Sequence, residues 1–248
     1  MYYSRILKQT VGNIISKSYG SIFYRNEKGL KVLMYHNIED SKKFDLYKIK
    51  YENFKKQISY IKNNNKKLKI VDIDEGIGSL SNIIITFDDA YTNIYKKVFP
   101  LLVENKIYFT VFVIGKFLKQ DYEKYISLKQ LREMSKSKYV TIGSHTFNHL
   151  NLQKCTEKNI KSEIYDSKKY LEDIIGKNVN YLSYPYGGYS DTIKKIVINA
   201  DYKGAFSSKF GFYNNLKNLH EIPRIDIWST DNINSLNDKI SGKWNWYS

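Results

Sequence analysis

IIITFDDA, residues 83–90, joins a run of apolar, mostly β-branched residues to two adjacent aspartates. A continuous apolar run of this length is typical of a strand buried on both faces, as in a parallel sheet. Two carboxylates directly after a buried strand are costly unless a positive group neutralises them. The segment therefore predicts an α/β fold whose functional side chains lie at the carboxyl ends of parallel strands.

Similar apolar runs alternate with helical patterns on both sides of this segment. We expect strands at residues 31–36, 68–71, 83–87, 109–114, 140–143, 180–184, 205–207 and 222–227. We expect helices at residues 52–63, 92–104, 128–136, 156–175 and 191–200, and we assign no element to the polar tail, residues 229–248. This order predicts a parallel sheet, either open or rolled into a barrel. With no internal repeat or linker, residues 31–248 form one predicted domain behind an N-terminal extension, residues 1–30.

The composition of the 248 residues excludes several classes of protein. Hydrophobic residues make up 42% of the chain, enough for a sizeable core, yet no run approaches the roughly 18–20 apolar residues of a membrane-spanning helix. A single cysteine, Cys155, rules out an intramolecular disulfide and a cysteine-based metal site. Forty basic against 25 acidic residues give a net charge of +15. The basic residues are dispersed and no nucleic-acid motif is present, so we expect no nucleic-acid partner.

The N-terminal segment, residues 2–18, has the pattern of a basic amphipathic helix. Its apolar residues recur at three-to-four-residue spacing: Tyr3, Leu7, Val11, Ile14 and Ile15. Such a helix could lie on a membrane interface, pack on its own domain or close the bottom of a barrel. The segment lacks the continuous apolar region of a signal peptide, so we expect a cytoplasmic or peripheral-membrane location, with an extracytoplasmic one left open.

Polar side chains follow several of the expected strands. They are His36, the pair Asp88-Asp89, the segment Ser144 to His149, and Tyr184 to Gly188. Two imidazoles at i and i+4, His145 and His149, together with a carboxylate from a neighbouring strand, suit a catalytic divalent cation. One of the two aspartates would bind the ion while the other accepts a proton. A chance pair of surface histidines, or an aspartate that caps the next helix, is the alternative interpretation.

Three ordered motifs resemble those of the NodB-like polysaccharide deacetylases. They are TFDDA at residues 86–90, IGSHTFNHLNL at 142–152 and SYPYG at 183–187, and the resemblance covers roughly residues 30–230. It implies a distorted (β/α) barrel that binds zinc, or else cobalt or nickel, through Asp89, His145 and His149. It also implies that Asp88 is the general base and that the backbone N–H of Tyr186 helps to hold the oxyanion.

The chain also departs from the family pattern. Ala90 stands where glycine is more usual, Ser183 stands where many members have an arginine, and the late Leu-x-His strand with the general acid is missing. LMYH at residues 33–36 resembles that strand moved to the front, as in the branch that deacetylates poly-N-acetylglucosamine. In a closed barrel the first and last strands are neighbours, so His36 is the expected acid.

Residues around the last strand also belong to the predicted site. His220 is the rival acid, and Asp226 could orient His36. Arg224 could replace the missing arginine by pairing with Asp88, or form a plain surface or structural ion pair.

The resemblance implies a metal-dependent hydrolase that removes acetyl groups, in the first place N-acetyl groups of GlcNAc-type sugars, from a glycan or its precursor. A catalytically idle subunit that binds glycan or membrane is the alternative, because of Ala90, Ser183 and the missing late motif. A glycosidase is disfavoured, because adjacent aspartates are poorly placed to flank a glycosidic bond.

Overall fold

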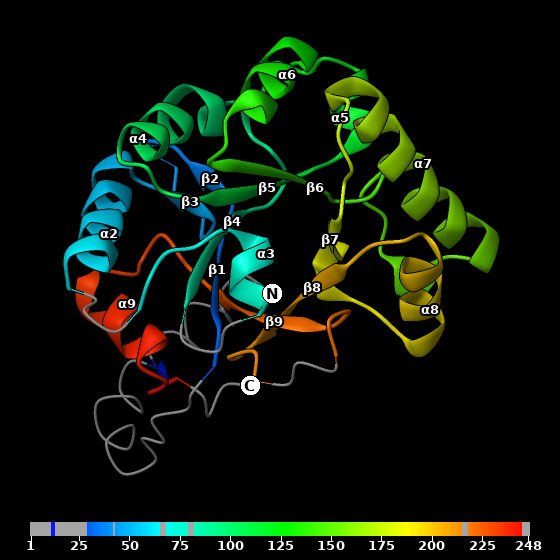
Figure 1. Ribbon diagram of the computed structural model, residues 1–248. Helices are drawn as coiled ribbons and strands as arrows, with labels where there is room; N and C mark the ends of the chain where they lie inside the picture. Colours follow the sequence, from blue (N-terminus) through cyan, green and yellow to red (C-terminus); the bar gives the residue numbers. More distant parts are fainter. Residues whose placement is uncertain are drawn as a thin grey trace.

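Seven parallel strands close into a barrel in the order β1-β4-β5-β6-β7-β8-β9 (Figure 1). The computed structural model describes residues 11–12, 29–41, 43–64, 68–78, 82–214 and 218–244. The barrel strands are β1 (Lys31–Tyr35), β4 (Ile83–Phe87), β5 (Phe109–Val113), β6 (Val140–Ser144), β7 (Tyr181–Ser183), β8 (Gly204–Phe210) and β9 (Ile222–Asp226). Closure comes from β1, which pairs with β4 on one side and with β9 on the other, Met34 facing Asp226. The predicted barrel of parallel strands is therefore confirmed.

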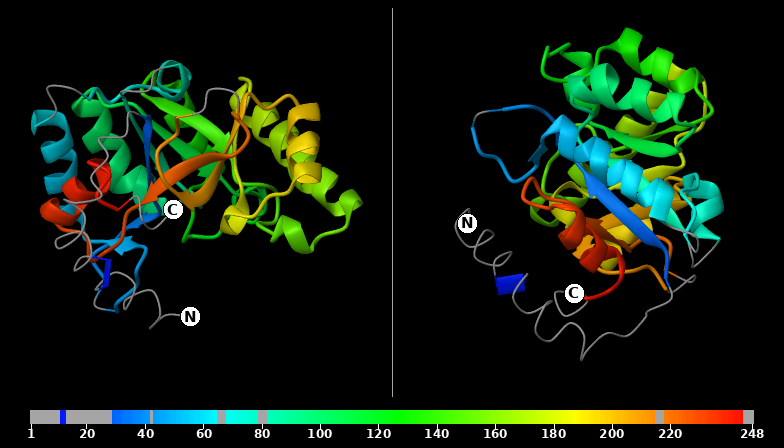
Figure 2. Two further views of the ribbon diagram at one scale, coloured as in Figure 1. Left: turned by 90° about the horizontal axis from the view of Figure 1, so that it is seen from below. Right: turned by 90° about the vertical axis from the view of Figure 1, so that its left-hand side faces the viewer.

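Helices surround the barrel, with α7 and α8 on one flank and α2 and α9 on the other (Figures 1 and 2). Their bounds are α2 (Tyr51–Asn64), α3 (Ile73–Ile77), η1 (Ile94–Val98), α4 (Phe99–Glu104), α5 (Gly115–Lys119), α6 (Leu128–Lys136), η2 (Leu152–Lys154), α7 (Glu157–Ile175), η3 (Pro185–Gly187), α8 (Asp191–Asn199) and α9 (Ile233–Ile240). A short parallel pair, β2 (Asn37–Ile38) and β3 (Lys48–Ile49), follows β1. Within the described residues, no helix has both the length and the apolar character needed to cross a membrane.

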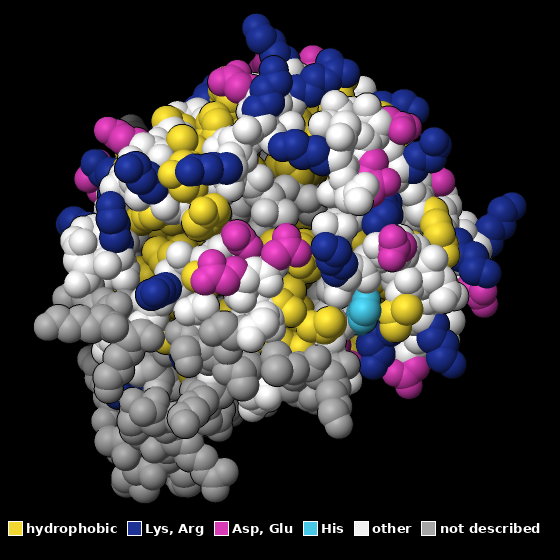
Figure 3. Space-filling model, viewed as in Figure 1, with side chains coloured by type: hydrophobic (Ala, Val, Ile, Leu, Met, Phe, Trp, Pro, Cys, Tyr) yellow, Lys and Arg dark blue, Asp and Glu magenta, His cyan; other side chains and the backbone are white. Residues whose placement is uncertain are grey.

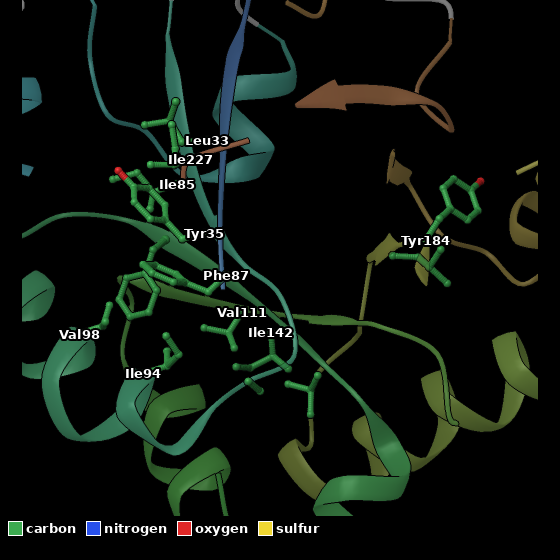
Figure 4. Close-up of a cluster of buried hydrophobic side chains, with 14 of the residues drawn as sticks. Leu33, Tyr35, Ile85, Phe87, Ile94, Val98, Val111, Ile142, Tyr184 and Ile227 are labelled. Carbon is green, nitrogen blue, oxygen red and sulfur yellow. The ribbon is translucent and has the colours of Figure 1, made fainter. Parts of the chain in front are cut away.

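The main core lies between the outer face of the barrel and the helices. Leu33 and Tyr35 of β1 and Phe87 of β4 point outward (Figure 4). Leu33 lies beside Ile85 and Ile227, and Phe87 lies toward Ile94 and Val98 of η1 (Figure 4). Side chains alternate across a strand, so the residues between these point into the barrel. Both faces are buried, which explains why the apolar run at 83–87 is continuous.

The interior of the barrel is apolar at the amino ends of its strands. Buried there are Leu30, Val32, Ile73, Ile84, Phe112, Tyr181, Phe206, Tyr213 and Ile222. The helix α3 closes this end, and Gly76 packs so tightly that an added Cβ would lie 2.6 Å from Ile84 Cδ1. Acidic side chains gather over α3 in Figure 3, including Asp74, which accepts a hydrogen bond from the Tyr181 hydroxyl. The polar residues that follow the strands lie at the opposite end of the barrel, at the carboxyl ends of the strands.

Several predicted elements differ from those observed. The strand expected at 68–71 is wrong: only Ile70 forms a bridge, to Ile83, because Asp72 then caps α3 and the chain leaves the sheet. The helix expected at 92–104 is divided into η1 and α4, and α9 forms in the tail where no element was expected. The amphipathic segment 2–18 lies outside the described residues apart from Val11 and Gly12, so its membrane contact stays a prediction.

Candidate active site

Three residues at the carboxyl ends of β4 and β6 form a group that could hold a metal ion. Asp89, His145 and His149 each offer one ligand atom, and these atoms all lie within 4.8 Å of one another. Asp89 Oδ1 lies 3.6 Å from His145 Nε2 and 3.7 Å from His149 Nε2. The structure thus brings together the three residues that the sequence assigned to a metal site, although they come from segments about 60 residues apart.

The backbone at these residues is unusual. Asp89, Ala90, Thr146 and His149 all have positive φ, between 54° and 69°. Such conformations are costly for residues other than glycine and concentrate at functional sites. At Ala90, with φ of 54°, the left-handed turn explains why a glycine would suit this position. The chain keeps the turn with alanine in its place.

Hydrogen bonding leaves the facing nitrogen of His145 free to bind an ion. His145 Nδ1 lies 2.7 Å from the backbone oxygen of Ser183, so this nitrogen carries the hydrogen and Nε2 is left as the electron donor. Burial, together with the neighbouring His145, lowers the pKa of His149 to about 4. His149 is therefore suited to be a neutral ligand near neutral pH, which is the form that a cation binds.

Asp88 is buried inside the barrel against Arg224. The guanidinium donates to both carboxylate oxygens, with Nη1 to Oδ1 and Nη2 to Oδ2 both at 2.8 Å. Arg224 also donates to the Ser207 carbonyl and to the Ser183 hydroxyl, and Ser183 donates to Asp88 in turn. Burial alone would raise the pKa of Asp88, but Arg224 and the nearby His145 and His36 hold this pKa well below its usual value. Asp88 is thus ionised throughout the neutral range.

The sequence left two roles open for Arg224, and the structure shows that it pairs with Asp88. Arg224 is 1% exposed, so the pair is not a surface ion pair. Ser183, which stands where an arginine was expected, leaves room for the guanidinium that reaches in from β9. Sequence reasoning gave Ser183 no role of its own.

Glu163 of α7 was not among the predicted site residues, yet it holds the loop that carries both histidines. Its carboxylate accepts hydrogen bonds from the Asn148 backbone N–H at 2.8 Å and from Asn148 Nδ2 at 2.6 Å. The Glu163 carbonyl accepts from the Phe147 N–H. A signal was available, because Glu163 follows Ile160 by three residues and so lies beside the apolar stripe of the helix.

His36 and Asp226 lie at the carboxyl ends of the neighbouring strands β1 and β9. His36 packs on Tyr47, with 4.4 Å between ring centroids. Asp226 Oδ2 accepts a hydrogen bond of 2.6 Å from the indole N–H of Trp228. His36 Nδ1 and Asp226 Oδ1 are both buried, and neither has a hydrogen-bond partner among the described residues.

His220 and Tyr186 occupy different surroundings. His220 precedes β9, so it lies at the amino end of that strand, where its Nε2 contacts the Tyr202 carbonyl at 2.8 Å. It is therefore at the opposite end of the barrel from Asp89 and its partners, and the structure does not bring it to the site. Tyr186 lies in η3 with its ring 4.9 Å from that of His149 and 68% exposed.

The donor set fits a zinc-type ion. Two imidazoles and one carboxylate leave open positions for water and substrate, as in catalytic rather than structural sites. His145 has the outer hydrogen bond that ligating histidines usually have. A barrel with such a group beside an ionised buried carboxylate is suited to metal-assisted hydrolysis.

Comparison with known proteins identifies the family. Residues 78–205, slightly more than half of the chain, match the family model for polysaccharide deacetylase. The chain belongs to the polysaccharide deacetylase family.

Relatives and solved structures agree with this assignment. The chain is 26% identical over 212 residues to YxkH of Bacillus subtilis, covering 84% of this chain and 75% of that relative. It is 29% identical over 203 residues to the poly-beta-1,6-N-acetyl-D-glucosamine N-deacetylase of Staphylococcus aureus, covering 75% and 70%. The fold is similar to that of the Streptococcus pyogenes deacetylase PplD in complex with acetate, with a TM-score of 0.78 at 23% identity, covering 85% and 97%.

Proposed function

We propose that the protein is a metal-dependent hydrolase that removes N-acetyl groups from a polymer or oligomer of N-acetylglucosamine. The observation that carries this proposal is the group Asp89, His145 and His149 beside the ionised Asp88, whose Oδ2 lies 3.8 Å from His145 Nε2. The name of the Staphylococcus aureus relative supports the choice of sugar.

Each residue of the site has a role in this proposal. Asp89, His145 and His149 would hold the ion, which when bound polarises the acetyl carbonyl and acidifies water. Asp88 accepts the proton of the attacking water. Its low pKa makes it a weak base, but one that is always in its ionised form. The backbone N–H of Tyr186 donates to the oxyanion.

His36 is the proposed proton donor to the leaving nitrogen. His36 follows Tyr35, whose carbonyl accepts the backbone N–H of Asp88 at 2.9 Å, so His36 and Asp88 follow neighbouring strands at the same end of the barrel. The charge of His36 also lowers the pKa of Asp88. Asp226 orients the imidazole and stabilises its protonated form. His220 has no part in the reaction, because it lies at the far end of the barrel.

Acetate release tests the proposal. The full chain loaded with zinc or cobalt is incubated with β-1,6-linked and β-1,4-linked N-acetylglucosamine oligomers. We expect acetate from at least one of them, and a loss of about 100-fold or more in kcat/KM for Asp88→Asn with metal content unchanged.

Two outcomes would contradict the proposal. If the protein releases no acetate from any acetylated glycan, and Asp89→Ala leaves the metal content unchanged, the proposal of a metal-dependent hydrolase is wrong. Glycan and metal binding without acetate release would instead indicate an idle binding subunit. Lys169→Met, an exposed change on α7, is the matched control.

A further inference from the structure

Lys239, on the inner face of α9, has a fully buried side chain that the reaction described above does not use. It is 0% exposed, and its Nζ donates to Asp231 Oδ2 at 2.5 Å and to the Asp226 carbonyl at 2.8 Å. The ammonium also lies 4.0 Å from the ring centroid of Trp228. Burying an ammonium and a carboxylate is costly, and an apolar side chain would serve packing as well. The pair therefore needs an explanation other than stability.

The contacts of Lys239 converge on Asp226. Asp231 Oδ2 accepts the backbone N–H of Trp228 at 2.7 Å as well as the Lys239 ammonium. The Trp228 indole N–H then donates to Asp226 Oδ2 at 2.6 Å. Lys239 thus fixes the loop after β9 at both ends, and the loop fixes one oxygen of Asp226.

The other oxygen of Asp226 is left for His36. Met34 of β1 pairs with Asp226 of β9. Because side chains alternate between the two faces of a strand, His36, two residues further along, points to the same inner face as Met34. Asp226 Oδ1 and His36 Nδ1 are both buried with no hydrogen-bond partner among the described residues, each other included, so both atoms remain available to pair when His36 carries a proton.

Lys239 also acts on the charge of Asp226. The pKa of this carboxyl is raised overall, chiefly by burial and also by Asp231. His36 at the end of β1, Lys239 on α9 and the Trp228 hydrogen bond lower it. Without Lys239 the carboxyl would be protonated at higher pH and would no longer stabilise a protonated His36.

We propose that Lys239 is a positioning residue for proton donation: through Asp231 and Trp228 it holds the Asp226 carboxyl in place on the inner face of the barrel that it shares with His36. This inference rests on the proposed function. In that reaction water oxygen bonds to the acetyl carbon, the C–N bond breaks, and the proton of His36 passes to the leaving nitrogen. A leaving group that departs as a stable anion, such as 4-nitrophenolate, needs no such proton.

The test compares two substrates in the full metal-loaded chain. Lys239→Met is combined with Asp231→Asn, so that no buried carboxylate is left unpaired. We expect kcat for the N-acetylated oligomer to fall about 10-fold or more. KM, cobalt affinity and the hydrolysis of 4-nitrophenyl acetate should stay within about twofold.

Two further variants keep the test decisive. Trp228→Phe retains the ring and removes the indole N–H, so it should give the same selective loss even if the double variant folds poorly. Lys31→Met is the matched control, since Lys31 is a second buried lysine, at the other end of the barrel, where its Nζ donates to the Gly29 carbonyl.

The outcomes separate this inference from the proposed function. Equal losses on amide and ester, or no loss at all in Trp228→Phe, would overturn the role of Lys239 while leaving the deacetylase intact. A wild-type chain that hydrolyses the ester but no glycan would overturn the proposed function itself.

Discussion

Arg224 shows how much one side chain contributes at the residue scale. It is the cation that neutralises Asp88 inside the barrel, and the two residues are 136 positions apart in sequence. The bidentate geometry fits the planar guanidinium, which a lysine could not reproduce. The low pKa of Asp88 therefore depends on a residue of the last barrel strand.

Replacing Arg224 tests this dependence. Arg224→Met leaves a buried carboxylate without a counter-charge and should lower the free energy of unfolding by about 3–5 kcal/mol. Lys169→Met breaks an exposed pair, with side chains 82% and 67% exposed, and should change it by less than about 1 kcal/mol. Urea denaturation of both chelator-treated variants at pH 7.5 measures the difference. Equal effects would mean that burial adds nothing to the Arg224–Asp88 pair.

At the scale of elements, α7 supports the metal group without contributing a ligand to it. Glu163 binds the backbone and side chain of Asn148 in the loop between His145 and His149. The positive φ of Thr146 and of His149 in this loop needs such support, because a free loop would relax to commoner conformations.

Removing that support should weaken metal binding more than folding. Glu163→Ala is expected to lower zinc affinity about 10–100-fold, since outer hydrogen bonds orient the ligands. Glu157→Ala on the exposed face of the same helix, where Glu157 pairs with Lys161, is the control and should leave affinity unchanged. Competition with a chelating dye gives both values. Unaltered affinity in Glu163→Ala would show that the loop holds its shape alone.

At the scale of the whole molecule, the site makes stability depend on pH. The pKa of His149 is about 4 in the folded protein, against an ordinary value of 6.5. As the pH falls, the unfolded chain therefore binds this proton before the folded protein does. Asp88 also has a lowered pKa, so its contribution is complete above its ordinary value of 3.8 and is lost at lower pH. Both effects have the same sign: acid favours the unfolded chain.

The metal-free protein should therefore lose stability as the pH falls from about 6.5 toward 4. Urea unfolding of chelator-treated protein at pH 7.5, 5.5 and 4.5 measures this loss. His149→Gln, which cannot titrate, should flatten the part of the curve above pH 4. A wild-type curve that is flat over this range would contradict the lowered pKa of His149.

Much of this architecture is readable from local patterns. The run at 83–87 and the helix at 128–136 have the predicted bounds, because burial on both faces and a capping box at Ser127 are encoded within a few residues. The prediction of a short strand at 68–71 is wrong because an apolar run alone does not distinguish a strand from the segment that leads into a helix. The helix α9 was missed because a polar tail gives little periodic signal.

The sequence by itself determined the order of strands and helices and the polar residues that end each strand, because periodicity, caps and chain order are local properties. Only the tertiary structure decided which of these residues meet. Barrel closure sets the register of β9 against β1, so it paired Arg224 with Asp88, brought His36 and Asp226 to the same end of two neighbouring strands, and left His220 at the opposite end. Glu163 and Lys239 are ordinary helix residues in sequence, and their contacts exist only because α7 and α9 pack against the ends of those strands.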